Sequence, residues 1–285
     1  MRTIPVAASR ALADLLTGPA HLAEVLTSGP RAAYLLVGGR VLAVVSDRAV
    51  APASSVLLPG TWDPQDLLPP GARVEVGHGV LTATGSCLRV ARWFTPASLI
   101  SGGVPDPRAL RTARDLLSCQ AIEPQVREVH RLGDVAGQRL TGVAEGDPAQ
   151  VLDSILGRGP GLTPSGDDVT AGLLLAARAV LLDPARIDRL GCRVLSLAAT
   201  ATTVVSRGML ADAAVGMCPA VVAAGLSALL RPWCPNSTPA ALRALVAVGH
   251  TSGSDLLAGT LAVLEHVSPA ACTVDRGVTA GAGTR

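Results

Sequence analysis

Two stretches in the second half of the sequence resemble each other: GLTPSGDDVTAGLLLAARAVL at Gly161–Leu181 and GHTSGSDLLAGTLAVLEHV at Gly249–Val267. Aligning Asp168 with Asp255 gives both stretches the pattern Ser-Gly-x-Asp, with a further glycine four residues after the aspartate. Each stretch follows a helical pattern that opens at a proline and ends at a glycine. We therefore predict a repeated unit of helix, tight turn, Ser-Gly-x-Asp and second helix.

A Ser-Gly-x-Asp turn at a helix start can form a binding site. The remaining backbone N–H groups and the helix dipole favour an anion there, glycine lets a backbone approach a ligand, and aspartate can hold a metal or orient an amide. Two such turns facing one another would make one site, whereas helix capping is the alternative for each turn. Asp168 is the candidate catalytic residue of these turns. The candidate substrate-binding residues are Thr163, Ser165, Gly166, Asp167, Ser252, Gly253 and Asp255.

The glycines that follow the two aspartates, Gly172 and Gly259, fall inside predicted helices. Glycine at such a position costs about 1 kcal/mol relative to alanine, so it needs a reason. We favour close packing of two helices over contact with a ligand.

All 24 basic residues are arginine, which excludes chemistry that depends on a lysine, such as a Walker A loop or a Schiff base. Arginine suits carboxylates and phosphates, so Arg207, in an apolar helical stretch, is a candidate substrate-binding residue. Its alternative is an arginine that extends from a helix end to solvent. His250 lies in the second stretch and is a candidate catalytic base near neutral pH, with capping or packing as the alternative.

Adjacent carboxylates at Asp167 and Asp168 raise the question of a metal. Neighbouring side chains on a helix start face different ways, which favours one ligand and one cap over a metal pair. The six cysteines form no Cys-x-x-Cys pair and have no histidine at zinc-site spacing. We expect no cofactor, with Mg²⁺ at the two aspartates as the alternative.

The first hundred residues show a different pattern, in which short apolar runs alternate with glycine and proline. Gly38-Gly39 separates two runs rich in β-branched residues, which predicts a hairpin. We predict an antiparallel β unit over residues 30–95, a small barrel or a sandwich, preceded by one or two short helices over residues 8–27.

After Pro105 the pattern becomes helical, and a capping residue followed by proline recurs. Four predicted helices open in this way, at Asp106-Pro107, Asp147-Pro148, Asp183-Pro184 and Thr238-Pro239. The predicted fold is α+β, with a β-rich unit and leading helices over residues 1–104, a helical domain over residues 105–269, and a frayed tail over residues 270–285.

Composition narrows the classes of partner. Hydrophobic residues make up 49% and charged residues 16%, a balance that excludes disorder for most of the chain. A net charge of +2 and 2% aromatic residues provide neither the basic field nor the stacking surface that nucleic acid requires. No apolar run reaches ~18 residues without arginine, aspartate or proline. We expect a cytoplasmic protein that binds neither nucleic acid nor membrane.

The string GLTPSGDD at 161–168, followed by Ala171-Gly172, resembles a bacterial family long described as a domain of unknown function, and Gly249–Gly259 is similar to that family's second motif. The family includes the AllH subunit of oxamate carbamoyltransferase. This resemblance implies an enzyme component of allantoin degradation, in purine catabolism, that moves a carbamoyl group between phosphate and oxamate. It also implies two other subunits as partners and a small anionic substrate such as carbamoyl phosphate or oxamate.

The sequence lacks the Ser-Thr-Arg-Thr phosphate loop of the well-known carbamoyltransferases. Helix starts and Arg207 would therefore have to hold carbamoyl phosphate. Two alternatives stay open. One is a Mg²⁺-dependent hydrolase of a small amide or phosphorylated compound, and the other is a non-catalytic assembly subunit whose turns are only caps.

Overall fold

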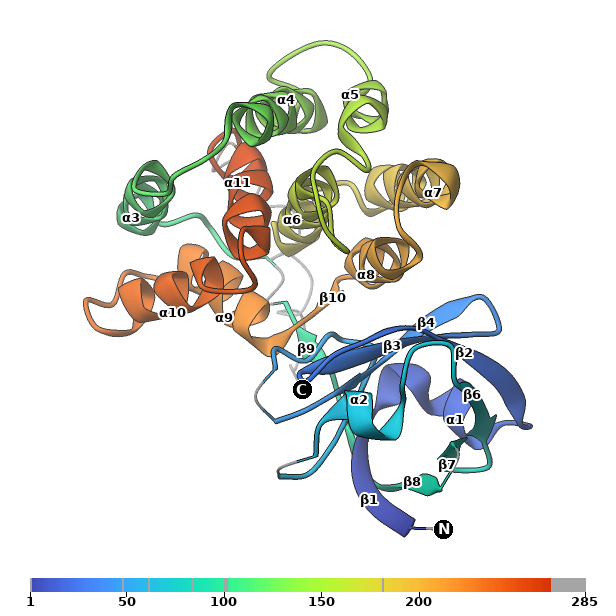
Figure 1. The fold of residues 1–285 in the computed structure, drawn as a ribbon. Helices are drawn as coiled ribbons and strands as arrows, with labels where there is room; N and C mark the ends of the chain where they lie inside the picture. Colours follow the sequence, from blue (N-terminus) through green and yellow to red (C-terminus); the bar gives the residue numbers. More distant parts are fainter. Residues whose placement is uncertain are drawn as a thin grey trace, which may run out of the picture.

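A computed structural model of the chain describes residues 2–267, apart from residues 48, 61, 84, 100, 101 and 181. The first part of the chain forms a β-barrel, and the remainder is helical (Figure 1). The predicted tail at residues 270–285 lies outside the described residues.

The barrel has eight strands, which close in the order β1-β5-β4-β3-β2-β6-β7-β8. Their bounds are β1 (Arg2–Ser9), β2 (His21–Ser28), β3 (Ala32–Val37), β4 (Arg40–Val45), β5 (Ser55–Leu57), β6 (Arg73–Gly77), β7 (Val80–Ala83) and β8 (Ser86–Phe94). Of the two predicted forms, a barrel or a sandwich, the unit has the barrel, and the predicted β3–β4 hairpin at Gly38-Gly39 is confirmed.

The expectation of an all-antiparallel unit was wrong, because β1 pairs with β8 and β4 pairs with β5 in parallel. Hairpin signals in a sequence identify antiparallel neighbours joined by a tight turn. A parallel pair needs a longer connection, and β1 and β8 come from opposite ends of the barrel sequence. No local pattern therefore marks these two pairs.

The predicted leading helices cover only part of the region assigned to them. A 3₁₀ turn (Arg10–Leu12) and α1 (Ala13–Thr17) are present, but β1 runs before them and β2 after them. In β1, Ile4, Val6 and Ala8 alternate with exposed or half-buried residues and face the barrel core. Pro5 interrupts β1, and Val25 and Thr27 are the only β-branched residues of β2, so neither strand stands out in a reading that looks for runs of β-branched residues.

The helical part has nine helices in the described residues. Their bounds are α3 (Pro107–Ser118), α4 (Pro124–Thr141), α5 (Pro148–Ile155), α6 (Ser165–Ala179), α7 (Pro184–Ala201), α8 (Val204–Ala214), α9 (Ala220–Leu229), α10 (Ser237–Val246) and α11 (Ser252–Leu264). Helix α6 is buried along nearly its whole length and lies among α4, α5, α7, α8 and α11 (Figure 1). None of these helices is both long and apolar enough to span a lipid bilayer.

Three of the four predicted helix starts are confirmed. Asp106, Asp147 and Asp183 each accept a hydrogen bond from a backbone N–H in the first turn of the following helix. The start at Thr238-Pro239 was wrong, because α10 begins earlier, at Ser237. Thr238 instead accepts a hydrogen bond at Oγ1 from the backbone N–H of Cys234 and so fixes the preceding loop. Proline is tolerated anywhere in a first turn, where its missing N–H has no partner to lose.

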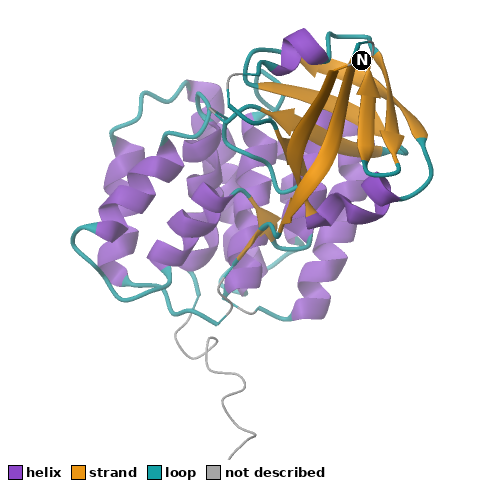
Figure 2. Cartoon of the chain, turned by 90° about the horizontal axis from the view of Figure 1, so that it is seen from below, coloured by secondary structure: helices purple, strands orange, loops and turns teal. Residues whose placement is uncertain are grey.

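The chain has two separate hydrophobic cores, one inside the barrel and one among the helices. The segment that follows β8 packs with the helices. Ala97 and Leu99 contact the helical core, and β9 (Ala97–Ser98) pairs with β10 (Met217–Cys218). Figure 2 shows the barrel at one side of the helical part. Helix α8 lies against β4 there.

Candidate functional site

The two Ser-Gly-x-Asp turns lie together because α6 and α11 pack closely in parallel. A Cβ atom on Gly172 would lie 2.0 Å from the carbonyl oxygen of Leu256, and one on Gly259 would lie 1.9 Å from that of Val169. Only glycine allows this approach, so the prediction of helix packing for these two glycines is confirmed. At the helix starts, Thr163 Oγ1 and Ser252 Oγ are 3.0 Å apart and hydrogen-bonded.

Asp168 and Asp255 lie at matching positions in the first turns of α6 and α11, and both are buried, with 8% and 0% exposure. The Oδ2 atom of each is buried without a hydrogen-bond partner. Burial holds the pKa of the Asp168 carboxyl well above its usual range. The charge of Asp255 raises this pKa further, and the hydroxyls of Ser252 and Thr163 oppose the shift. The two carboxylates therefore sense each other.

His130, on α4, completes this arrangement. Its Nε2 atom is 2.6 Å from Oδ1 of Asp255, so one oxygen of Asp255 is bound and the other is unused. The sequence analysis did not select His130. The sequence does contain a sign that the face of α4 with His130 packs closely on other helices, because Gly133 and Gly137 follow on the same face, three and seven residues later. They let α4 approach Val169 of α6 and Ala262 of α11 closely.

Asp167 has a different role from its neighbour. Its Oδ1 accepts the backbone N–H of Gly157 at 2.8 Å, and its Oδ2 accepts the hydroxyls of Ser206, at 2.6 Å, and Thr202. The carboxylate therefore ties the end of the α5 segment and the α7–α8 connection to the start of α6. With both oxygens bound to protein donors, it has little capacity left for a substrate or a metal.

The glycines of the two turns also contact protein. A Cβ on Gly166 would lie 1.8 Å from the carbonyl oxygen of Ile155, and one on Gly253 would lie 2.0 Å from that of Leu245. Their backbone N–H groups donate to the carbonyls of Arg158 and Val248. At both positions the absence of a Cβ makes room for the end of the preceding helix.

The remaining candidates fall at different places. Ser165 is buried beside Gly159, and Ser252 contacts Thr163 as described. His250 is exposed in the turn before α11. Arg207 extends toward the barrel, where its guanidinium lies 3.5 Å from the carbonyl oxygen of Gly39. The structure thus brings Asp168, Asp255, Thr163 and Ser252 together and directs Arg207 elsewhere.

Residues 155–264 match the family of the oxamate carbamoyltransferase subunit AllH. The resemblance inferred from the motifs is therefore confirmed for this segment. The AllH match spans both turns and the helices α6 and α11, and it does not reach the barrel or His130. No solved structure matches the chain.

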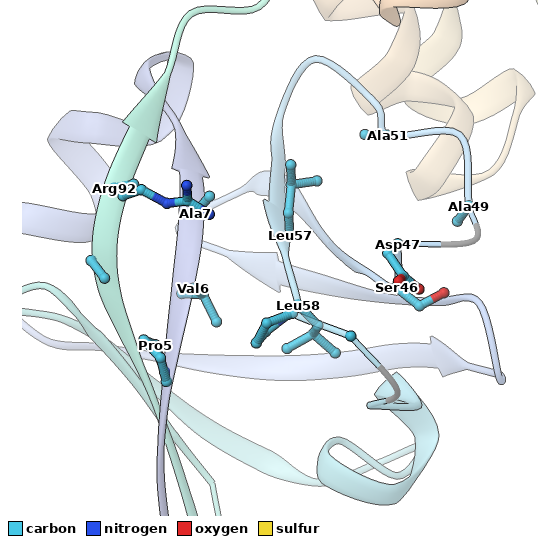
Figure 3. A pocket seen from close by; sticks show the side chains of 13 residues that line it. Pro5, Val6, Ala7, Ser46, Asp47, Ala49, Ala51, Leu57, Leu58 and Arg92 are labelled. Atoms are coloured by element: carbon cyan, nitrogen blue, oxygen red, sulfur yellow. The ribbon is translucent and has the colours of Figure 1, made fainter.

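A hollow of about 490 Å³ lies on the barrel, outside the AllH match. Figure 3 shows it between β1 and β8 on one side and β5 with the segment before it on the other. Most of the residues that line it are apolar, such as Val6, Leu57 and Leu58. Its polar lining includes Asp47 and Arg92. It contains none of the residues selected from the sequence.

Proposed function

We propose that this chain is a component of an oxamate-type carbamoyltransferase and that it holds a small substrate where α6 and α11 begin. The AllH match supports this proposal because it spans both helix starts. The observation that carries the site is that buried Asp168 and Asp255 each keep one carboxylate oxygen without a partner.

A buried carboxylate oxygen without a donor destabilises a folded protein, because burial removes its water and nothing replaces it. Natural structures contain few such groups, and each one needs an explanation. Two of them at equivalent positions of a repeat argue for a shared task. A bound ligand that donates hydrogen bonds would remove the cost.

The transfer itself sets the chemistry. The amide nitrogen of the acceptor attacks the carbonyl carbon of carbamoyl phosphate, the carbon–oxygen bond to phosphate breaks, phosphate leaves, and the nitrogen loses a proton. In this proposal, Asp168 and Asp255 accept hydrogen bonds from the substrate and fix its direction relative to the second reactant. Such orientation lowers the barrier to a reaction between two molecules.

The anionic end of the substrate needs groups from elsewhere. The N–H groups of Gly166 and Gly253 already donate to protein carbonyls, and Arg207 contacts the barrel. The charge of Asp255 would itself repel a phosphate or a carboxylate, and the raised pKa of Asp168 favours a neutral carboxyl, which offers no positive charge. We therefore propose that companion subunits bind the anionic end, in agreement with the description of AllH as a subunit.

The test measures the melting temperature of the chain, alone and with its companion subunits, in the presence of oxamate, carbamoyl phosphate or phosphate. A ligand at ~100 times its Kd should add roughly 2.7 kcal/mol to the free energy of unfolding. Asp168→Asn should weaken ligand binding and transfer activity at least tenfold while changing that free energy by less than about 1 kcal/mol. Asp212→Asn, at a buried carboxyl remote from the turns, is the matched control and should leave binding unchanged.

Other outcomes favour the alternatives. If Asp168→Asn melts early and binds ligand normally, Asp168 is only a cap and the assembly-subunit alternative is preferred. Loss of the thermal shift on addition of EDTA would favour the Mg²⁺-dependent hydrolase. Additive losses in Asp168→Asn and Asp255→Asn would place the two carboxylates at separate sites.

A further inference from the structure

We infer that Asp168 and Asp255 determine specificity for a primary amide by accepting its N–H groups at their unused Oδ2 atoms, and that His130 positions Asp255 for this task. The inference rests on the proposed function, since it assigns to the same site the part of the substrate that the site recognises. It adds a positioning residue that lies outside the AllH match.

The balance of donors and acceptors at the helix starts carries the argument. The acceptors without a partner are two carboxylate oxygens. Few donors are left nearby, because the N–H groups of Gly166 and Gly253 bind backbone carbonyls and one of the Thr163 and Ser252 hydroxyls donates to the other. A single hydroxyl hydrogen of that pair is left to face Asp168. A site of this kind recognises a group that donates hydrogen bonds rather than one that accepts them.

A primary amide fits such a site because its nitrogen carries two N–H donors and no charge. The two carboxylates come from parallel helices at equivalent positions of the repeat. Each can therefore accept one of the two N–H groups. Replacing the NH2 group with an oxygen or a methyl group would leave both buried oxygens without donors, which is the situation that gives the largest discrimination between substrates.

His130 fixes which oxygen of Asp255 is available. Its Nε2 atom contacts Oδ1 of Asp255 at 2.6 Å, and the histidine side chain is only 15% exposed. Helix α4 is held in place at Gly133, where a Cβ would lie 2.5 Å from Cγ1 of Val169. The carboxylate of Asp255 is thus fixed in one orientation, with Oδ2 left for the ligand.

His266 provides a matched control for His130. It pairs with Asp134 of the same helix α4, at 2.8 Å between Nε2 and Oδ1, and its side chain is 22% exposed. Asp134 and His266 belong to neither turn. Removing His266 therefore deletes a similar histidine–aspartate pair without touching the candidate site.

The experiment uses the full chain with its companion subunits and two ligand pairs that differ only at the amide. Oxamate is compared with oxalate, and carbamoyl phosphate with acetyl phosphate, by calorimetric titration. The unmodified protein should prefer the amide of each pair by about 100-fold or more. Asp168→Asn and Asp255→Asn supply a donor to the site, so the oxamate-to-oxalate preference should fall at least tenfold in each.

The variants of His130 separate positioning from general stability. His130→Ala should reduce the amide preference, and His130→Gln should restore part of it because its side-chain N–H can still donate to Asp255. His266→Ala should leave the preference unchanged. Equal binding of oxamate and oxalate would overturn the inference even if transfer activity is normal. An amide preference without any transfer activity would instead overturn the proposed function and leave the inference intact.

Discussion

Asp167 and Asp168 are adjacent in the sequence, but their carboxylates have different surroundings. Asp167 accepts hydrogen bonds at both oxygens, and Asp168 keeps Oδ2 without a partner. Their side chains leave the helix start about 100° apart, so one faces the α5 and α8 segments and the other faces α11. The sequence analysis favoured one ligand and one cap, and it could not say which residue was which.

At Asp212, on α8, we predict a dependence of stability on pH. Its carboxyl accepts the backbone N–H and hydroxyl of Ser54, and burial raises its pKa from 3.8 to about 6. The folded protein therefore binds this proton more tightly than the unfolded chain does. The resulting stability is fully present below pH 4 and is lost as the pH rises through 6.

Denaturant unfolding of the unmodified protein and of Asp212→Asn between pH 4 and 7 measures this effect. The free energy of unfolding of the unmodified protein should decrease relative to that of the variant by at most about 3 kcal/mol across this range. The lost hydrogen-bond acceptor contributes a difference between the two proteins that is the same at every pH. If the whole difference is independent of pH, Asp212 does not have the raised pKa.

Among single residues, the capping aspartates were the ones that sequence reasoning could place. Asp106 and its counterparts act within two or three residues along the chain, and such local geometry follows from the sequence. His130 and Asp255 are far apart in sequence and meet only when α4 packs on α11. The sequence does not show which residues will meet through tertiary packing. For His130 it offers only an indirect sign, the glycines at Gly133 and Gly137 that allow α4 to pack closely.

At the scale of elements, the contact between α6 and α11 holds the two turns together. The repeat predicted two equivalent units, and the glycines indicated where their helices touch. What the sequence did not contain was the direction of packing. The parallel arrangement follows from two contacts: Thr163 meets Ser252 at the helix starts, and Thr260 Oγ1 lies 3.5 Å from the carbonyl oxygen of Gly172 further along both helices.

Substitution of either glycine in this contact should be strongly destabilising. In Gly172→Ala or Gly259→Ala, the new Cβ would lie about 2 Å from a backbone carbonyl oxygen that cannot move independently of its helix. We expect a loss of about 2 kcal/mol or more, which exceeds the gain of about 1 kcal/mol in helix propensity. Gly29→Ala, which meets no atom within 4 Å, should change stability little. Chemical denaturation would measure all three variants, and unchanged midpoints for the helix variants would contradict the packing.

On the scale of the whole molecule, the barrel and the helices have separate cores, with contacts between α8 and the barrel. Gly208 of α8 lies against Val41 of β4, and Asp212 binds Ser54. The α+β architecture, a β unit in the form of a barrel or a sandwich, and most helix starts could be predicted because each depends on local periodicity and turn residues. The closure of the barrel could not, because it depends on pairing between distant strands.

Separate cores predict that the helical part folds without the barrel. A fragment of residues 95–285 retains Ala97 and Leu99, which pack on the helical core, and keeps β9 for its pairing with β10. We expect a helical circular-dichroism spectrum, a cooperative thermal transition and the same relative effect of Gly172→Ala as in the full chain. A broad transition without cooperativity would show that the helices depend on the barrel.

The parallel pairing of β1 with β8 has a consequence for the order in which the chain folds during synthesis. β1 leaves the ribosome first, and its longest partner, β8, is the last barrel strand to follow. Until then, β1 has only the two-residue pairing with β5. The nascent chain must therefore carry an uncovered strand edge through the synthesis of seven further strands, and Pro5, which lacks an N–H group, makes that edge a poorer template for aggregation. The barrel can close only after Phe94 has emerged, so it matures late relative to its own length.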